Sequence, residues 1–320
     1  MTQHLVTSDI AKDTLHGLRS NPKFLLSKYF YDDRGSSIFQ DIMQMKEYYL
    51  TDCEFEIFTT HKKTITDAMR QDVIGFDLIE LGSGDGLKTK ILLQFLIENS
   101  VLFHYIPIDI SHKANIELVE SLKIELPLLR VNAKTGDYFE EVKKLNGFSG
   151  LRKVILMLGS NIGNFTDEEI NQFFGQLSVL CHKGDKALIG FDLKKSPEVI
   201  MKAYNDPYGH TRRFNLNHLL RLNRELNADF NPDSFEQHTQ YSPVTGEVKS
   251  YLVSKAEQTV YIADLDQSFQ FRKWEPIFME LSRKFDLETI NSLAQKHGFK
   301  VETEFFDRKN YFVDSLWIKE

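Results

Sequence analysis

The run Phe76-Asp77-Leu78-Ile79-Glu80-Leu81-Gly82-Ser83-Gly84-Asp85-Gly86 joins an apolar segment that ends in an acid to a cluster of glycines. The residues that follow have a helical pattern, with apolar side chains at Ile91, Leu92, Leu93, Phe95 and Leu96. A strand, a tight turn and a helix in this order open a nucleotide-binding α/β sheet. Glycines in the turn let the backbone approach a ligand where a Cβ atom would collide.

The spacing of these glycines indicates which ligand the loop holds. The pattern is G-S-G-D-G rather than G-x-G-x-x-G, and Glu80 stands just before the turn. This form suits S-adenosylmethionine, which has no pyrophosphate for the helix N-terminus to bind. We therefore predict that Glu80, Gly82, Ser83 and Gly84 contact S-adenosylmethionine. A nicotinamide dehydrogenase is the alternative, and the glycine spacing disfavours it.

The composition is that of a globular protein and excludes several classes. The 320 residues are 42% hydrophobic and 27% charged, enough for one large or two ordinary domains. A net charge of -7 without a long basic run argues against nucleic-acid binding. Cys53 and Cys181 have no metal-site spacing and form no disulfide framework, so we expect a reducing cytoplasm and no metal. No apolar stretch approaches the length of a membrane helix, so we expect no membrane partner.

Beyond the glycines, apolar segments alternate with helical patterns. The segments are residues 102–109, 128–131, 153–158 and 186–192. Near-continuous apolar strands between helices indicate a parallel sheet covered on both faces, which binds ligands beyond the carboxyl ends of its strands. Those ends carry Glu80, Asp109, Asp137, residues 159–164 and Asp192.

The C-terminal sequence departs from the alternation of apolar strands and helices. Asp286 is typical of a helix N-cap, the helix runs through His297, and Gly298 ends it. Two β-rich segments follow at 299–306 and 311–319. We predict an antiparallel pair at the sheet edge, which is a mark of S-adenosylmethionine methyltransferases and not of dehydrogenases.

Two regions interrupt this Rossmann-like α/β pattern, residues 1–54 and 195–285. The second contains a polar helical stretch at 213–227 and strand patterns near 249–254 and 259–263. We predict that both regions form a discontinuous α+β substrate-binding domain, and that residues 55–194 and 286–320 form the cofactor domain.

Further side chains at the strand ends suit the cofactor. Asp109, about 25 residues after the glycines, is placed to accept hydrogen bonds from the ribose hydroxyls. Asp137 and Tyr138 suit the adenine amino group and ring, and Lys88 suits the cofactor carboxylate. Strand-end caps, a core tyrosine and a surface lysine are the structural alternatives.

Four segments suit an amine acceptor, although each also has a structural explanation. Residues 159–164, with Gly159 and Asn164, follow the fourth strand, where turn formers are common. Tyrosines gather at 29–31 and 48–49, where aromatic faces attract a cation or pack together in a core. In Glu280-Leu281-Ser282, an extended backbone points the carboxylate and the hydroxyl the same way, which suits an imidazole or water.

Together these residues resemble the histidine-specific, S-adenosylmethionine-dependent methyltransferases that begin ergothioneine synthesis by forming the trimethylated betaine hercynine. The similarity runs from about Lys28 to the C-terminus. The matching motifs are Lys28-Tyr29-Phe30-Tyr31-Asp32-Asp33-Arg34-Gly35-Ser36, Glu47-Tyr48-Tyr49, residues 80–84, Leu158-Gly159-Ser160-Asn161-Ile162-Gly163-Asn164, residues 213–230 and Glu280-Leu281-Ser282-Arg283-Lys284-Phe285.

The resemblance implies a role for each matching position. Asn164 and Tyr204 would take the substrate carboxylate, while Glu280 and Ser282 would read the imidazole. Tyr31, Tyr48 and the Gly159 carbonyl would surround the α-amine, with Tyr31, Tyr48 and Asn164 as the catalytic residues. Lys88, Asp109, Asp137 and Tyr138 would hold the cofactor. L-Histidine is then the small-molecule partner, and we expect a monomer.

One departure leaves the substrate open. Ser250 stands where the family commonly has a methionine that lines the imidazole pocket. A serine leaves more room and more polarity, so a methyltransferase for another amine, such as a tryptophan derivative, is an alternative. A non-catalytic S-adenosylmethionine-binding module is another, against which the complete set Tyr31, Tyr48, Asn164 and Tyr204 argues.

Overall fold

The computed structural model describes residues 8–145 and 149–320. The chain divides into two compact units, which we describe separately. The insert unit comprises Met1–Tyr49 and Lys195–Ser282, and the sheet unit comprises Leu50–Lys194 and Arg283–Glu320. The sequence predicts domain boundaries at residues 55, 195 and 286. The two units divide at residues 50, 195 and 283.

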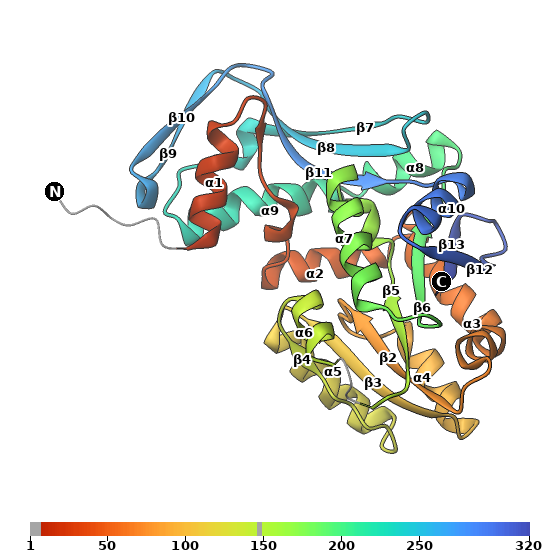
Figure 1. The fold of residues 1–320 in the computed structure, drawn as a ribbon. Helices are drawn as coiled ribbons and strands as arrows, with labels where there is room; N and C mark the ends of the chain where they lie inside the picture. The colour runs from red at the N-terminus through yellow and green to blue at the C-terminus, as the bar shows by residue number, and fades with distance from the viewer. Residues whose placement is uncertain (1–7, 146–148) are drawn as a thin grey trace. The chain divides into compact units, whose positions relative to one another are not determined.

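The sheet unit is built on seven strands in the order β12-β13-β6-β5-β2-β3-β4 (Figure 1). Their bounds are β2 Gly75–Leu81, β3 Leu102–Asp109, β4 Lys134–Thr135, β5 Arg152–Met157, β6 Lys186–Asp192, β12 Phe299–Phe306 and β13 Phe312–Lys319. Strands β2 to β6 pair in parallel, while β13 pairs antiparallel with both β6 and β12. The parallel sheet and the antiparallel C-terminal pair that the sequence predicts are confirmed.

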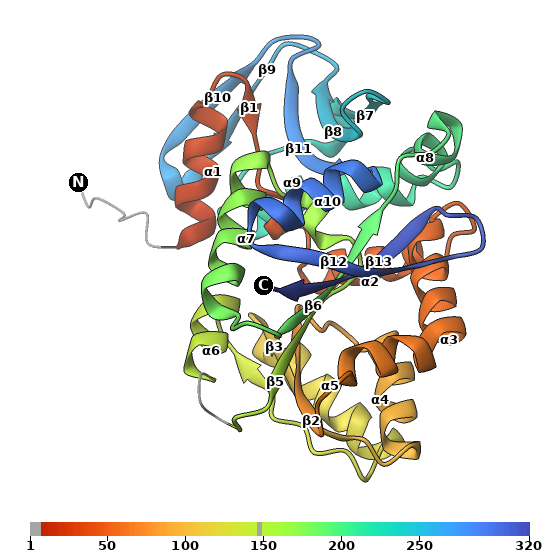
Figure 2. The same cartoon turned by 45° about the vertical axis from the view of Figure 1, so that its right-hand side comes forward.

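Helices cover both faces of this sheet. They are α3 Tyr49–Arg70, α4 Thr89–Glu98, α5 His112–Glu125, α6 Tyr138–Lys144, α7 Asp167–Leu180 and α10 Leu287–Lys296. Figure 2 shows α6, α7 and α10 on one side of the strands and α3, α4 and α5 on the other. All residues of β2 and β6 are buried, as expected for parallel strands between two helical layers. Ile155, Ile189 and Trp317 belong to the core under α7 and α10.

The predicted strand at 128–131 is wrong. The chain turns there instead, with the Leu129 amide donating to the Leu126 carbonyl at 2.9 Å. Leu128 is 81% exposed, so its apolar side chain marks no buried strand. Val131 forms a single bridge to Tyr105, and the edge strand β4 comes later, at Lys134–Thr135. Pro127, which lacks an amide hydrogen, suits a turn more than a strand.

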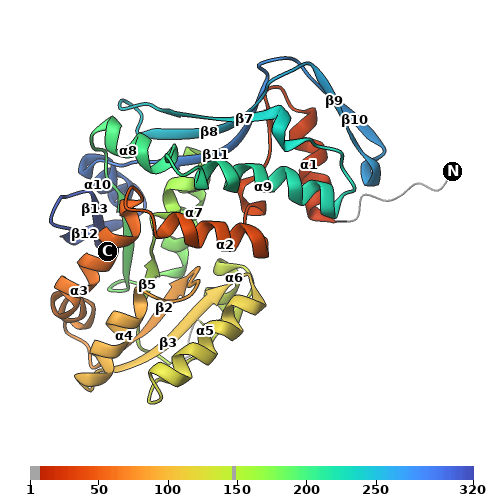
Figure 3. The same ribbon diagram turned by 180° about the vertical axis from the view of Figure 1, so that it is seen from behind.

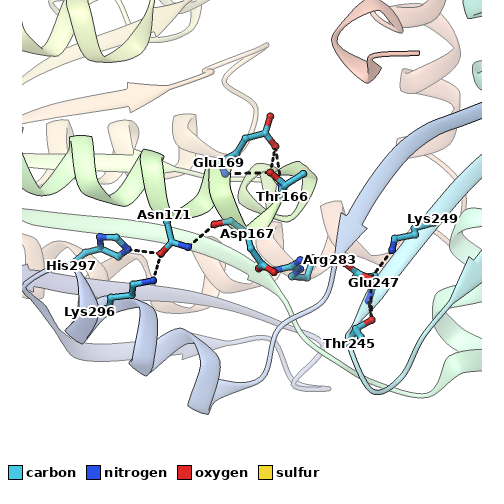
Figure 4. A network of polar contacts seen from close by, with 10 residues as sticks. All are labelled: Thr166, Asp167, Glu169, Asn171, Thr245, Glu247, Lys249, Arg283, Lys296 and His297. Carbon is cyan, nitrogen blue, oxygen red and sulfur yellow. Dashed lines mark hydrogen bonds and ion pairs between the residues drawn. The ribbon is translucent and has the colours of Figure 1, made fainter. Parts of the chain in front are cut away.

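The ends of α7 and α10 show how local sequence sets the helices. Thr166 and Glu169 form a capping box at the start of α7, and Asp167 pairs with Arg283 (Figure 4). Asp286 caps α10, accepting from the Thr289 amide at 2.8 Å, and Gly298 follows the helix with φ 71°. The predicted helix from Asp286 to His297 is therefore confirmed, with its stop at a glycine.

The insert unit contains a four-stranded sheet in the order β1-β11-β8-β7 and a hairpin of β9 and β10 (Figure 1). The strands are β1 Lys23–Phe24, β7 Phe235–Tyr241, β8 Glu247–Ser254, β9 Gln258–Ile262, β10 Gln267–Phe271 and β11 Pro276–Arg283. The helices are α1 Asp9–Arg19, α2 Asp33–Met43, α8 Pro197–Tyr204 and α9 His210–Glu225. Short 3-10 turns lie at η1 Ser27–Tyr29, η3 Pro232–Ser234 and η4 Ala263–Leu265, and η2 Asn161–Asn164 belongs to the sheet unit.

An apolar core joins the helices and the sheet of the insert unit. It joins residues of α1, α2 and α9 to the sheet, among them Leu18, Ile42, Leu219 and Leu252. Figure 3 shows α2 lying along α9. Segments from the N-terminus and from residues 195–282 therefore share one core, and β1 pairs in parallel with β11.

Candidate active site

The glycine loop after β2 leaves space that a side chain would fill. Gly82 has φ 74°, and a Cβ atom there would lie 2.8 Å from the Tyr138 hydroxyl. Gly84 has φ 52°, with nothing within 4 Å of its Cβ position. Positive φ angles favour glycine, so the loop needs these residues for its backbone shape. The predicted ligand loop thus has an open side at Gly84 and a wall at Tyr138.

The hydroxyl of Ser83 also belongs to this loop. Ser83 is 7% exposed, and no hydrogen-bond partner for its Oγ occurs among residues 8–145 and 149–320. Buried hydroxyls are normally hydrogen-bonded, so an orphan beside an open loop fits a polar ligand. The residues present therefore fit S-adenosylmethionine at this loop.

Asp109, Asp137 and Tyr138 come together near the loop. One oxygen of Asp109 accepts from the Ser111 amide at 2.8 Å, and Oδ1 of Asp137 caps α6 through the Phe139 and Glu140 amides. Burial raises the pKa of Tyr138 to about 12, and the charges of Asp109 and Asp137 add to this. The two acids thus flank a phenol that stays protonated.

Glu80 has partners within the fold itself. It is 3% exposed, and its two oxygens accept from the hydroxyls of Thr89 and Tyr105, each at 2.5 Å. Burial raises its pKa to about 7, although both hydrogen bonds oppose the rise. In the structure Glu80 ties β2 to the start of α4 and to β3, and a contact with the cofactor stays a prediction.

Lys88 pairs with an acid that sequence reasoning missed. Its ammonium contacts Glu54, a fully buried residue on α3. Burial alone would lower the pKa of Lys88, but the carboxylate of Glu54 outweighs it and raises the pKa. Glu54 also accepts from the backbone amide of Gly159 at 2.8 Å. Nothing in the sequence marks Glu54, because its partners are distant along the chain.

Gly159 and Asn164 belong to the turn that follows β5. Gly159 has φ 73° and Ser160 has φ 57°, and the Ser160 hydroxyl accepts from the Asp192 amide at 2.9 Å. A Cβ atom on Gly163 would lie 2.7 Å from the Arg283 carbonyl oxygen. The turn is therefore anchored at both ends, with Asn164 exposed on η2.

In the insert unit, the predicted tyrosines form one aromatic cluster. Tyr31 and Tyr48 each pack edge-on against Phe39, with centroids 5.4 and 6.1 Å away. Tyr31 is 47% exposed, yet burial around its hydroxyl raises its pKa well above the usual range, and Glu280, Tyr48 and Tyr204 raise it further. Tyr31, Tyr48, Tyr204 and Glu280 are therefore within electrostatic reach of one another.

Tyr204 and Ser282 meet directly in the same unit. Their hydroxyl oxygens lie 2.8 Å apart, and the Tyr204 carbonyl accepts from Thr239 and Gln237. Ser250, 1% exposed, pairs with Thr239 across β7 and β8. The structure thus gathers Tyr31, Tyr48, Tyr204, Glu280 and Ser282 from four separate segments of the chain.

Residues 8–145 and 149–320 meet neither the requirements of a metal site nor those of a membrane-spanning helix. No group of three or more His, Cys, Asp or Glu side chains there is placed to hold a metal ion. No helix in these ranges has the length and apolar character needed to span a membrane.

Comparison with known proteins identifies the family. The family described as histidine-specific, SAM-dependent methyltransferases matches residues 10–319. A histidine N-alpha-methyltransferase of Mycolicibacterium smegmatis is 34% identical over 310 residues, which is 97% of this chain and 95% of the relative. One from Mycobacterium tuberculosis is 33% identical over 88% of this chain and 86% of its own. The ergothioneine biosynthesis protein 1 of Schizosaccharomyces pombe is 27% identical over 88% of this chain and 37% of its own.

The match covers nearly the whole chain, and the sheet order with its antiparallel C-terminal pair agrees with it. The chain belongs to the histidine-specific methyltransferase family and is an enzyme that uses S-adenosylmethionine.

Proposed function

We propose that this enzyme transfers methyl groups from S-adenosylmethionine to the α-amine of L-histidine and continues to the trimethylated product, hercynine, the first step of ergothioneine synthesis. The observation that carries the proposal is the gathering of Tyr31, Tyr48, Tyr204, Glu280 and Ser282 in the insert unit. Two relatives that match most of the chain are named as histidine N-alpha-methyltransferases, which supports this substrate.

Glu280 and Ser282 would distinguish histidine from other amino acids. A carboxylate accepts an N–H of the imidazole, and a hydroxyl either donates to or accepts from the ring. Tyr204 would bind the substrate carboxylate. A site built to hydrogen-bond a ring N–H rejects side chains that lack it, because its own polar groups are then left unpaired.

Tyr31 and Tyr48 would hold the amine. The pKa of Tyr31 lies well above its usual range, so its phenol stays protonated at neutral pH and does not act as a base. Its hydroxyl and ring face instead hold the amine by hydrogen bonding and cation–π attraction. We assign the departing proton to water.

S-Adenosylmethionine, when bound, supplies a methyl group on a positively charged sulfur, a good leaving group. In the transfer, the amine lone pair would form the new N–C bond as the C–S bond broke, and the electron pair of that bond would stay on sulfur. The residues of this chain contribute alignment, which is worth several powers of ten when the reacting atoms are held about 3 Å apart. Each methyl group removes an N–H, so the tyrosine faces must hold a growing cation over three rounds.

The test is a turnover assay on the purified protein. S-Adenosylmethionine and a mixture of the protein amino acids are added, and mass spectrometry reads gains of one, two or three methyl groups. Histidine that gains three supports the proposal. Tryptophan or another amine that gains mass while histidine does not would overturn the substrate, and the absence of any product despite cofactor binding would favour a non-catalytic module.

A further inference from the structure

Glu54 joins two parts of the sheet unit that the reaction uses. It lies on α3 and is fully buried. One of its oxygens lies 2.8 Å from the Gly159 amide nitrogen and the other lies 3.1 Å from it, and the second also contacts the Lys88 ammonium. Lys88 stands directly before α4, after the glycine loop, while Gly159 opens the turn after β5.

A second acid shares this buried place. Asp314 on β13 is fully buried, and within residues 8–145 and 149–320 no N–H or hydroxyl donor reaches either oxygen. Its neighbour is the carboxyl of Glu54, and two adjacent carboxyls coexist by sharing a proton. Burial, reinforced by Glu54, raises the pKa of Asp314 well above its usual range. The neutral form of Asp314 is therefore favoured beside Glu54.

The sheet makes room for this arrangement at Gly190. A Cβ atom there would lie 2.6 Å from Oε1 of Glu54, so any side chain at this position of β6 would displace the carboxylate. A buried carboxylate is costly unless its hydrogen bonds and charge are satisfied. Here the Lys88 ammonium and the Gly159 amide supply the charge and the hydrogen bond.

We propose that Glu54 is a positioning residue for methyl transfer: its carboxylate orients the Lys88 ammonium toward the cofactor and holds the backbone at Gly159. The inference rests on the proposed function, since Lys88 is expected to bind the cofactor carboxylate and the Gly159 carbonyl to face the amine. Lys88 carries three N–H donors, so its contact with Glu54 leaves donors for a ligand.

Glutamine cannot replace Glu54 without a conflict. One oxygen of the carboxylate faces the Gly159 amide and the other faces the Lys88 ammonium, and both of these groups are donors. The side-chain amide of glutamine has one acceptor and one donor end, so its NH2 group must face one of them. Glu54→Gln therefore keeps the size of the side chain but misplaces either Lys88 or Gly159.

The experiment compares Glu54→Gln with Glu56→Gln. Glu56 lies two residues along α3 and pairs with Arg308 outside this cluster, so it controls for a charge lost from the same helix. We expect Glu54→Gln to lower kcat on the order of 100-fold and Glu56→Gln to leave it within twofold. Binding of S-adenosylhomocysteine, measured by calorimetry, should weaken about tenfold in Glu54→Gln alone.

A third readout needs neither substrate nor cofactor. Glu54, Glu80 and Asp314 are the acids that raise the pKa of Lys88, whereas burial lowers it. Loss of the Glu54 charge should therefore lower the pKa of Lys88. Lys88 should then be acetylated several-fold faster by acetic anhydride at pH 8, read by peptide mass spectrometry. Adding Asp314→Asn to Glu54→Gln should further lower kcat and cofactor affinity and further speed the acetylation of Lys88. The reason is that Asp314 can otherwise ionise and replace part of the lost charge.

The outcomes separate this inference from the proposed function. Glu54→Gln that folds, with cofactor affinity and Lys88 labelling both within twofold of the parent, overturns the role of Glu54. A parent protein that methylates no histidine overturns the proposed function instead, while cofactor binding and Lys88 labelling still test Glu54. A thermal midpoint close to that of Glu56→Gln shows that Glu54→Gln is folded.

Discussion

The hydroxyl oxygen of Tyr204 lies 2.8 Å from that of Ser282, so two residues expected to bind different groups of the substrate are hydrogen-bonded to each other. Tyr204 ends α8, and Ser282 lies near the end of β11. The bond fixes the direction of both hydroxyls. Each can then offer its remaining hydrogen-bonding capacity to a ligand from a defined position.

Tyr204→Phe tests this relationship. Loss of one hydroxyl removes a hydrogen bond to the substrate and frees Ser282 to rotate, so we expect the KM for histidine to rise about tenfold. Cofactor affinity should not change. Steady-state kinetics and calorimetry measure the two quantities, and an unchanged KM would mean that Tyr204 does not touch histidine.

Glu280→Ala should abolish most histidine binding. The carboxylate is the charged group expected to accept the imidazole N–H, and charge-assisted hydrogen bonds contribute about 1.5–3 kcal/mol each. Titration with histidine and, separately, with S-adenosylhomocysteine distinguishes a local effect from misfolding. Equal loss of both affinities would point to a folding defect and not to a substrate contact.

Ser250→Met tests the departure from the family pattern. Ser250 is 1% exposed, so a methionine must occupy space inside the insert unit. If the pocket has room there, the larger apolar side chain should raise kcat/KM for histidine relative to tryptophan. Competition between the two amino acids, followed by mass spectrometry, measures the ratio. A sharp drop in thermal stability would show instead that the space is already filled.

Gly82→Ala should weaken cofactor binding more than tenfold. The new Cβ would lie 2.8 Å from the Tyr138 hydroxyl and would force an unfavourable φ of 74°. Gly175→Ala is the matched control, because Gly175 lies inside α7 with nothing within 4 Å of its Cβ position. There alanine should stabilise the protein by about 0.5–1 kcal/mol. Calorimetry and thermal unfolding provide the two readouts.

Glu80→Gln should flatten the pH dependence of stability. The folded protein raises the pKa of Glu80 from 4.5 to about 7, so it binds this proton more tightly than the unfolded chain does. The free energy of unfolding therefore falls as pH rises from about 4.5 to about 7, by ~3 kcal/mol for this group. Urea unfolding across that range measures the slope. A slope in Glu80→Gln identical to that of the parent protein would refute the raised pKa of Glu80.

Several elements follow from local sequence, and the structure confirms them. Strand β3 has the predicted bounds, because a near-continuous apolar run admits one buried extended segment. Asp286 and Gly298 bound α10 as predicted, because capping depends on residues a few positions apart. The strand predicted at 128–131 is wrong because apolar composition does not reveal that Leu128 faces solvent.

Sequence alone predicts the Rossmann-like sheet and its glycine loop, carries the residue types of the family motifs, and marks two regions that interrupt the sheet pattern. Only the tertiary structure placed Tyr204 against Ser282 and Glu54 against Lys88, Gly159 and Asp314. The physical reason is the distance along the chain over which each kind of interaction acts. Strand and helix patterns arise from neighbours along the chain, whereas burial of a charge and the pairing of distant side chains depend on which elements pack together. Glu54 looks like any helix acid until α3 lies against β6 and β13, where a glycine leaves space for it.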